Sequence, residues 1–349
     1  MSALTAIEGF DWIDHLSYAY STTSGSPVTA SASSRFGTGR YLQLTNGDGL
    51  KIATNLPGQK QSGVMGFAFL NTNVGTSSDD ICMLYRDVAN GTACHRLQLT
   101  SAGALNILNG GGASIASSTN TMSSNTWYYV EWLWEINDVT AEVGGIWVDG
   151  IQWVTISAGV DTKVGPATQS ADYFVLMGHT NGTTRFDDVY VSTHQSGLLG
   201  DMQIVSLVAT GDSPAYKTWT NNAGNQTNNY SYVDETGNPD DDATYVFTTG
   251  DQKLELYRFG NLPVTANKIF GIELITRAKK SGVGDMFIGQ DFLTDTSVTE
   301  PTDSKTQLSA SYTYIRTLVE ENPDTSSLFS ESEINNLHFG SKSYTGTVH

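Results

Sequence analysis

One short segment, residues 126–136, constrains the fold of this chain more than any other, because its side chains follow a period of two. The even-numbered positions are apolar or aromatic: Tyr128, Val130, Trp132, Trp134 and Ile136. The odd-numbered positions include Glu131 and Glu135. A period of two places one face of a β-strand in a core and the other toward water, whereas a helix would scatter the tryptophans around its circumference. The segment therefore predicts a half-buried strand.

The segment that follows carries the strongest turn signal in the chain. Asp149–Gly150 separates the apolar residues Val148 and Ile151. A two-residue type I′ turn needs a positive φ at both central residues, and Asp-Gly satisfies that need. The sequence therefore predicts a β-hairpin in which Val148 and Ile151 face each other.

Similar short apolar runs fill the rest of the first two hundred residues, with glycine-rich turns between several of them. The predicted strands are residues 41–44, 64–70, 81–86, 94–99, 104–108, 174–177 and 184–191. Asn46–Gly47, Asn90–Gly91 and Gly110–Gly112 supply turns. Many short strands with regular turns are typical of a β-sandwich.

A boundary is expected beside Leu199–Gly200, after a polar stretch with no pattern, which divides the chain into domains 1–198 and 199–349. The strands predicted beyond it are residues 202–209, 215–220, 243–248, 269–277, 286–288 and 312–319. Ser330 followed by Glu333 is a capping box, which predicts one short helix before the chain returns to strand at His338. We expect an all-β protein of two sandwiches with very little helix.

Charge and cysteine content exclude several function classes. The 349 residues include 36 acidic and 18 basic side chains, a formal net charge of −18. Binding to the phosphate backbone of nucleic acid requires a basic face, so no nucleic-acid partner is expected. The chain has two cysteines, too few for a disulfide scaffold. No stretch approaches the about 18 apolar residues of a membrane span and no signal peptide is apparent, so we expect cytoplasmic synthesis without membrane insertion.

Two sets of motifs resemble known families. Residues 35–42, 126–131, 147–150 and 185–191 resemble a concanavalin A-like, laminin-G-like lectin/glucanase sandwich. Residues 199–202, 232–235, 239–246 and 331–340 resemble the smaller jelly-roll-like module that follows such domains in virion proteins of tailed bacteriophages. The resemblance implies a non-enzymatic structural component displayed on the virion: a head decoration protein, a head or neck fibre, or a minor tail protein. It also implies other virion proteins as partners, and phage fibres make a homo-oligomer the expectation.

The glucanase side of that resemblance draws attention to Glu131 and Glu135. Retaining glycosidases need two carboxyl groups about 5–5.5 Å apart. Positions i and i+4 of a strand share a face but lie about 13 Å apart. The related glucanases shorten this gap with a bulge and carry an aspartate between the glutamates, where this chain has Leu133. We therefore expect two solvent-facing glutamates and no catalytic residues, with glycan hydrolysis as a distant alternative.

A calcium site is a second hypothesis, because lectin-like sandwiches often hold calcium near the last strand. Asp187 and Asp188 stand there, and Glu8 and Asp11 of the N-terminal segment could add ligands. Calcium takes six to eight oxygens, and the sequence does not show which backbone carbonyls would complete the set. The alternative places Asp187 at a turn and Asp188 in solvent, and we assign no metal ligand and no cofactor.

The remaining polar motifs favour structural roles. Asp240–Asp242 lacks the spacing of an EF-hand and is expected to form an acidic turn before a strand. The six histidines have no zinc-ligand spacing. The predicted strand pairing projects Cys82 and Cys94 to opposite faces, so we expect two free, buried thiols.

A lectin-like, receptor-binding adhesin is the main alternative to an assembly protein. Sugar rings stack on exposed aromatic side chains, and Trp127 and Tyr129 are the candidates for such stacking. This alternative adds a glycan of the host surface to the expected partners.

Overall fold

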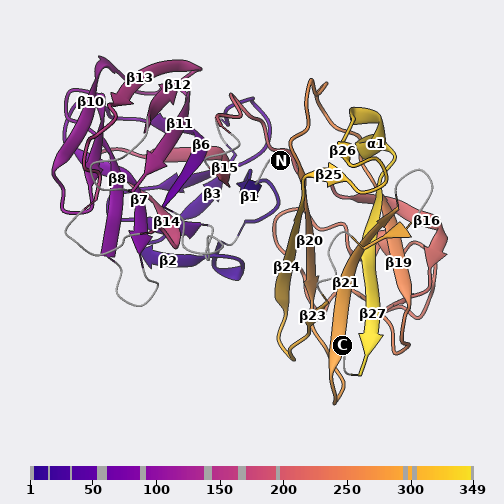
Figure 1. The fold of residues 1–349 in the computed structure, drawn as a ribbon. Helices are drawn as coiled ribbons and strands as arrows, with labels where there is room; N and C mark the ends of the chain where they lie inside the picture. Colours follow the sequence, from indigo (N-terminus) through magenta and orange to yellow (C-terminus); the bar gives the residue numbers. More distant parts are fainter. Residues whose placement is uncertain are drawn as a thin grey trace. The chain divides into compact units, whose positions relative to one another are not determined.

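The computed structural model describes residues 4–14, 16–31, 34–52, 61–86, 92–136, 144–163, 170–193, 197–293, 298–300 and 305–346. The regular secondary structure of this part of the chain is nearly all β-strand, arranged in antiparallel sheets (Figure 1). The predicted fold class is confirmed. In the described part of the chain, no helix has the length and apolar character that crossing a membrane requires.

The chain forms two compact units, Met1–Ile204 and Val205–His349. The first unit therefore includes the segment 197–204, which the sequence analysis divided between the two domains. This segment matters for the candidate site, because its backbone amides are bound by side chains of the first unit.

Two large antiparallel sheets build the first unit from its described residues. The eight-stranded sheet has the order β13 (Ile151–Ile156), β12 (Gly144–Val148), β11 (Tyr128–Glu135), β6 (Ser62–Asn71), β15 (Thr184–Thr193), β4 (Tyr41–Leu44) and β3 (Val28–Ala30), with β1 (Leu4–Glu8) also paired to β15. The seven-stranded sheet has the order β10 (Ser114–Thr121), β9 (Ala104–Asn109), β8 (Thr92–Leu99), β7 (Asp79–Arg86), β14 (Tyr173–Met177), β5 (Gly49–Ile52) and β2 (Ser21–Ser24). A 3-10 turn, η1 (Leu16–Tyr18), lies between β1 and β2 in sequence.

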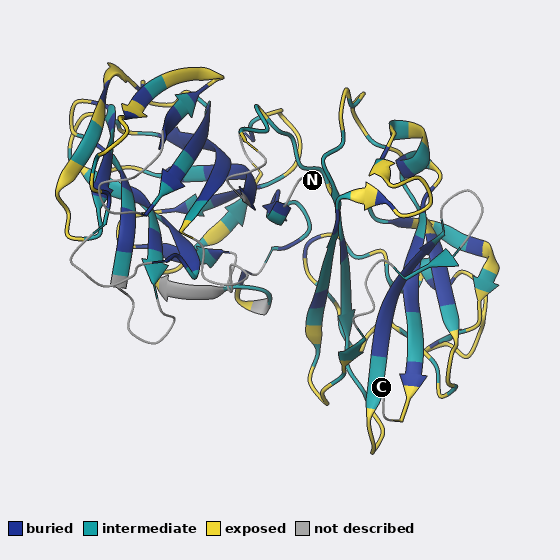
Figure 2. Ribbon diagram, viewed as in Figure 1, coloured by how far each residue is buried: buried dark blue, intermediate teal, exposed yellow. Residues whose placement is uncertain are grey.

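Side chains from the two sheets meet in a closely packed interior, which makes the unit a β-sandwich. Trp132 of β11 stacks on His95 of β8, with ring centroids 5.7 Å apart. The sulfur atoms of Met65 in β6 and Cys82 in β7 lie 3.5 Å apart. Buried residues follow the central strands of both sheets (Figure 2).

The local predictions for this unit hold where the pattern was strongest. Val130, Trp132, Trp134 and Ile136 are all buried, as the alternation predicts. In the 149–150 turn, Asp149 and Gly150 have φ values of 50° and 76°, and Val148 pairs with Ile151. The predicted Asn90–Gly91 turn lies outside the described residues.

The second unit contains a six-stranded sheet and several two-stranded pairs. The larger sheet has the order β16 (Ala209–Lys217), β19 (Leu254–Phe259), β27 (His338–Thr345), β21 (Met286–Leu293) and β22 (Val298–Thr299), with β23 (Thr306–Gln307) also paired to β21. The pairs are β17 (Thr220–Asn221) with β18 (Val246–Phe247), β20 (Ile272–Ala278) with β24 (Thr313–Val319), and β25 (Glu321–Asn322) with β26 (Ser327–Leu328). A 3-10 turn, η3 (Asn229–Tyr232), and the helix α1 (Glu331–Asn335) complete the described elements.

The pair β20–β24 packs against the larger sheet of this unit. Gln290 of β21 donates to the backbone oxygens of Leu274 in β20 and Ile315 in β24, at 3.0 and 3.2 Å. An apolar cluster surrounds that contact: Leu274, Phe292, Val319, Phe329, Ile334, Leu337 and Phe339. The helix α1 contributes Ile334 to this core.

One predicted element of this unit is confirmed in detail and one is wrong. The Ser330 side chain accepts from Glu333 N and the Glu333 side chain accepts from Ser330 N, which is the expected capping box. The strand predicted over residues 202–209 is absent, because residues 202–208 have no ladder partner and Ile204 N bonds to a side chain instead. The ladder begins at Ala209.

Candidate functional site

The outer face of the eight-stranded sheet carries the polar side chains that sequence analysis singled out. Side chains alternate across a strand, so Phe69 and Phe186 point into the sandwich, where their rings lie 5.4 Å apart. Their neighbours Leu70 and Arg185, which are cross-strand partners, point the other way. Trp127, just before β11, lies at the same end of this face.

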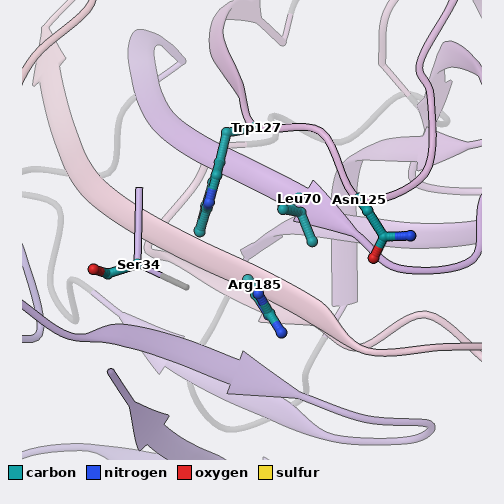
Figure 3. A pocket seen from close by; sticks show the side chains of 5 residues that line it. All are labelled: Ser34, Leu70, Asn125, Trp127 and Arg185. Atoms are coloured by element: carbon teal, nitrogen blue, oxygen red, sulfur yellow. The ribbon is translucent and has the colours of Figure 1, made fainter. Parts of the chain in front are cut away.

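A hollow of about 330 Å³ lies at that end of the face. Five residues line it: Ser34, Leu70, Asn125, Trp127 and Arg185 (Figure 3). In the view of Figure 3, Ser34 and Trp127 stand on one side of Arg185, and Leu70 and Asn125 on the other. The volume is at the lower end of the about 300–1,000 Å³ typical of small-molecule sites.

Tyr41 holds the two largest side chains of the hollow in place. This tyrosine is buried in β4. Its ring contacts the Trp127 indole edge-on at 6.0 Å and lies 4.9 Å below the Arg185 guanidinium. Both contacts are favourable, the first between aromatic quadrupoles and the second between a cation and a ring face. The indole and the guanidinium are therefore fixed before any ligand arrives.

Two polar atoms of the hollow are buried without a hydrogen-bond partner in the described structure: Ser34 Oγ and Arg185 Nε. Buried polar groups are nearly always paired, so such atoms identify places where a ligand or solvent bond is required. Asn125 adds an exposed side-chain amide, whose nitrogen donates weakly to Thr72 O at 3.4 Å. The arrangement is an aromatic wall surrounded by hydrogen-bonding groups.

Trp127 retains partial exposure, as its proposed role requires, but Tyr129 does not. Tyr129 is 2% exposed, and its hydroxyl donates to Asp188 O at 3.1 Å. The guanidinium of Arg35 covers its ring at 5.0 Å. The prediction of Tyr129 as an exposed stacking residue is therefore wrong, because the chain around Arg35 packs over it.

Glu131 is also buried rather than solvent-facing, which corrects a second prediction. Its carboxylate oxygen Oε1 accepts from the Tyr190 hydroxyl at 2.5 Å and from Gly200 N at 2.8 Å. The Tyr190 oxygen in turn accepts from Leu199 N at 3.1 Å. Glu131 thus binds the segment around Gly200, which follows the last strand of the sandwich. Glu135 takes no part in these bonds. Burial, then the charge of Glu131, raises the pKa of Tyr190.

The calcium hypothesis concerned Asp187, Asp188, Glu8 and Asp11. Asp188 is buried, not in solvent, and occupies a β-bulge with a φ of 49°. Arg35 donates to its Oδ2 at 2.9 Å, so the cation beside Asp188 is a guanidinium. Ile204 N donates to Oδ1 at 2.7 Å.

The other carboxylates of that hypothesis bind backbone groups. Glu8 accepts from Phe10 N at 2.7 Å, and Asp11 accepts from Arg40 N at 2.5 Å. Burial, and next the charge of Asp188, raises the pKa of Asp187 well above the usual range. Within the described residues, no group of three or more histidine, cysteine or acidic side chains has metal-ligand geometry.

The polar motifs of the second unit have structural partners. Asp241 forms a two-point ion pair with Arg277, at 2.6 and 2.9 Å, and Lys279 donates to Asp242 at 2.6 Å. Asp240 accepts from the Thr244 hydroxyl at 2.7 Å, which closes the predicted acidic turn. Arg277 and Lys279 are thus the partners of the predicted acidic run.

The cysteines match their prediction, and the histidines include one unexpected feature. Cys82 and Cys94 are both buried thiols. His95 is fully buried, and neither ring nitrogen has a hydrogen-bond partner in the described structure. Sequence reasoning identified Trp127 in the hollow but missed Arg185, which stands in a strand motif and carries no signal of its own.

No protein-family model and no curated protein matches the sequence. Several solved structures are similar in fold. Domain 4 of AbnA, a GH43 extracellular arabinanase from Geobacillus stearothermophilus, is 12% identical over 55% of this chain and 93% of that chain, with a TM-score of 0.39. The carbohydrate-binding module CBM66 from Bacillus subtilis is 11% identical over 49% and 95% of the two chains, with a TM-score of 0.33.

A PL-14 alginate lyase from Aplysia kurodai is 12% identical over 54% of this chain and 99% of that chain, with a TM-score of 0.40. These matches are β-sandwich domains, and the first unit of this chain is a β-sandwich too. The expectation that the chain is not an enzyme is contradicted by these matches, since they include enzymes.

Proposed function

We propose that this protein binds a carbohydrate in the hollow lined by Trp127 and Arg185. The observation that carries the proposal is the combination of a fixed, partly exposed indole with two unpaired buried polar atoms, Ser34 Oγ and Arg185 Nε. A sugar ring offers an apolar face for the indole and hydroxyl groups for the polar atoms. A volume of about 330 Å³ suits one or two sugar rings.

The test is a binding assay with the full chain and two substitutions of Trp127. Trp127→Ala removes the stacking surface, whereas Trp127→Phe keeps an aromatic ring. Binding should be lost in the first variant and retained with reduced affinity in the second, as measured on a glycan array and by calorimetry with the best ligand. Equal binding by wild type and Trp127→Ala would exclude the hollow as the site.

A matched control lies in the same sheet but outside the residues that line the hollow. Trp153 of β13 contacts Tyr128 edge-on at 6.1 Å and is also partly exposed. Trp153→Ala removes an indole of the same kind outside the hollow. This variant should bind like wild type, and a loss of binding equal to that of Trp127→Ala would indicate general destabilisation.

We also propose that the glycan-binding unit is displayed on a bacteriophage particle, as the motifs of residues 199–202 and 331–340 suggest. The host-surface glycan would then be the ligand, and other virion proteins and further copies of this chain would be partners. Mass spectrometry and cryo-electron microscopy of purified particles test this directly. Absence of the chain from particles, together with retained glycan binding, would refute the virion role alone.

A further inference from the structure

We propose that the hollow selects a sugar that carries a carboxylate, and that Arg185 is the residue that recognises it. This inference rests on the proposed carbohydrate binding and names its substrate class.

Arg185 is held by its face and has an unsatisfied edge. The ring of Tyr41 supports the guanidinium at 4.9 Å, which fixes its plane. Nε is buried and has no acceptor in the described structure. A planar guanidinium donates two parallel N–H bonds to one carboxylate, so a fixed plane with an unpaired Nε is suited to such a group.

Most arginines of this chain already have a carboxylate partner. Ion pairs join Arg35 to Asp188, Arg40 to Asp14, Arg96 to Asp80, Arg277 to Asp241, and Arg316 to Glu273. Arg185 has no such partner among the described residues, in a chain with 36 acidic side chains. A carboxylate of the ligand would give Arg185 the ion pair that the other arginines form with acidic side chains of the chain.

The groups nearest to Arg185 do not replace that partner. Its cross-strand neighbours are Gln43 and Leu70, which are uncharged. The nearest acid along β15 is Asp187, which is buried and whose Oδ1 accepts from Asp188 N at 2.9 Å. Burial raises the pKa of Asp187, which favours its neutral form. The hollow is therefore locally cationic within a strongly anionic protein.

The net charge of −18 strengthens the assignment to a specific site. A long-range field of this sign repels anions, so an acidic glycan gains nothing from general attraction. Binding of an acidic sugar would then depend on the local guanidinium, with Trp127 stacking on the ring and Ser34 bonding to a hydroxyl. Substitution of Arg185 alone should therefore abolish the preference for an acidic over a neutral sugar.

The experiment compares matched ligands on the full chain. The probes are oligosaccharides that contain a uronic or sialic acid and the same oligosaccharides with the carboxyl reduced to a primary alcohol. Charge-assisted hydrogen bonds contribute enough for a difference of about 10- to 100-fold in Kd between the two forms. Wild type should show this ratio, and Arg185→Gln should bind both forms with equal, weak affinity.

Two further variants separate recognition from folding. Arg185→Lys keeps the charge without the two-point geometry and should retain only part of the ratio. Arg96→Gln removes an arginine that is paired within the same unit and should leave the ratio unchanged. Thermal unfolding of each variant establishes that it is folded before its Kd values are compared.

The outcomes distinguish the two proposals. Equal binding of acidic and reduced sugars by wild type, or an unchanged ratio in Arg185→Gln, would overturn the selectivity while leaving carbohydrate binding intact. Stronger binding of sulfated sugars than of carboxylated sugars would also overturn it. No binding of any sugar by wild type would overturn the proposed function itself.

Discussion

Because of His95, we expect the free energy of unfolding of the first sandwich to fall measurably in acid. The side chain is fully buried in the first sandwich and stacks on Trp132 with an interplanar angle of 16°. Neither ring nitrogen has a partner in the described structure, so protonation would place an unsolvated charge in the core. Burial lowers the pKa of His95 from 6.5 to about 4.

The size of the effect follows from this difference in pKa. Between pH 6.5 and about pH 4 the unfolded chain binds a proton at this histidine and the folded chain does not. The contribution to stability is therefore fully present above pH 6.5 and is lost as the pH falls toward 4. At about 1.36 kcal/mol for each unit, the loss is about 3.4 kcal/mol.

The perturbation is His95→Leu, which keeps an apolar side chain of similar size and cannot titrate. Urea unfolding of both proteins at several pH values between 8 and 4.5 is followed by tryptophan fluorescence. Of the 7 tryptophans, Trp219 alone belongs to the second unit, so the signal reports mainly on the first. The wild-type free energy of unfolding should fall relative to the variant by about 2 to 3 kcal/mol over this range.

Comparison between the two proteins isolates the histidine from other titrating groups. Asp187, whose pKa is raised, stabilises the folded state as the pH falls, and this opposing effect is present in both proteins. His338→Gln serves as a control, because that histidine is partly exposed and its pKa is lowered less. Parallel stability curves for wild type and His95→Leu would refute the reasoning and show that a buried bond satisfies the ring.

Three further predictions concern packing, capping and thiol reactivity. A Cβ on Gly66 would lie 2.0 Å from the Tyr190 ring, so Gly66→Ala should cost about 3 kcal/mol or more, whereas Gly211→Ala, which has open space, should cost less than about 1 kcal/mol in urea unfolding. Ser330→Ala removes the capping box and should lower the stability of the second unit by about 1 kcal/mol, measured as a shift in Tm; an unchanged Tm would contradict this. Burial raises the pKa of Cys94 to about 11, so a thiol reagent at pH 8 should label it only after denaturation, and rapid labelling of the native protein would contradict its burial.

The sequence by itself determined the local architecture. Alternation over residues 126–136 set which side chains enter the core, because a strand has a period of two whatever it packs against. The Asp149–Gly150 turn and the Ser330 capping box were likewise predictable, since each depends on a few adjacent residues. These features together indicated an all-β protein.

Only the tertiary structure decided what happens on the outer face of the eight-stranded sheet. The pattern of β11 marks Tyr129 and Glu131 as the wetter face, but Arg35 covers the first and the backbone of Gly200 binds the second. A period-two pattern distinguishes two faces and carries no information about which later segment will cover one of them. Such cover comes from residues far away in sequence.

The hollow is likewise a product of the tertiary structure. Leu70, Trp127 and Arg185 of its lining adjoin only because β6, β15 and the start of β11 are neighbours in the folded sheet, and Ser34 comes from the segment between β3 and β4. Trp127 could be suspected from its chemistry, but Arg185 acquires its character from what surrounds it. A guanidinium becomes a recognition group when the fold fixes its plane and withholds an acid, and both conditions are properties of the tertiary structure.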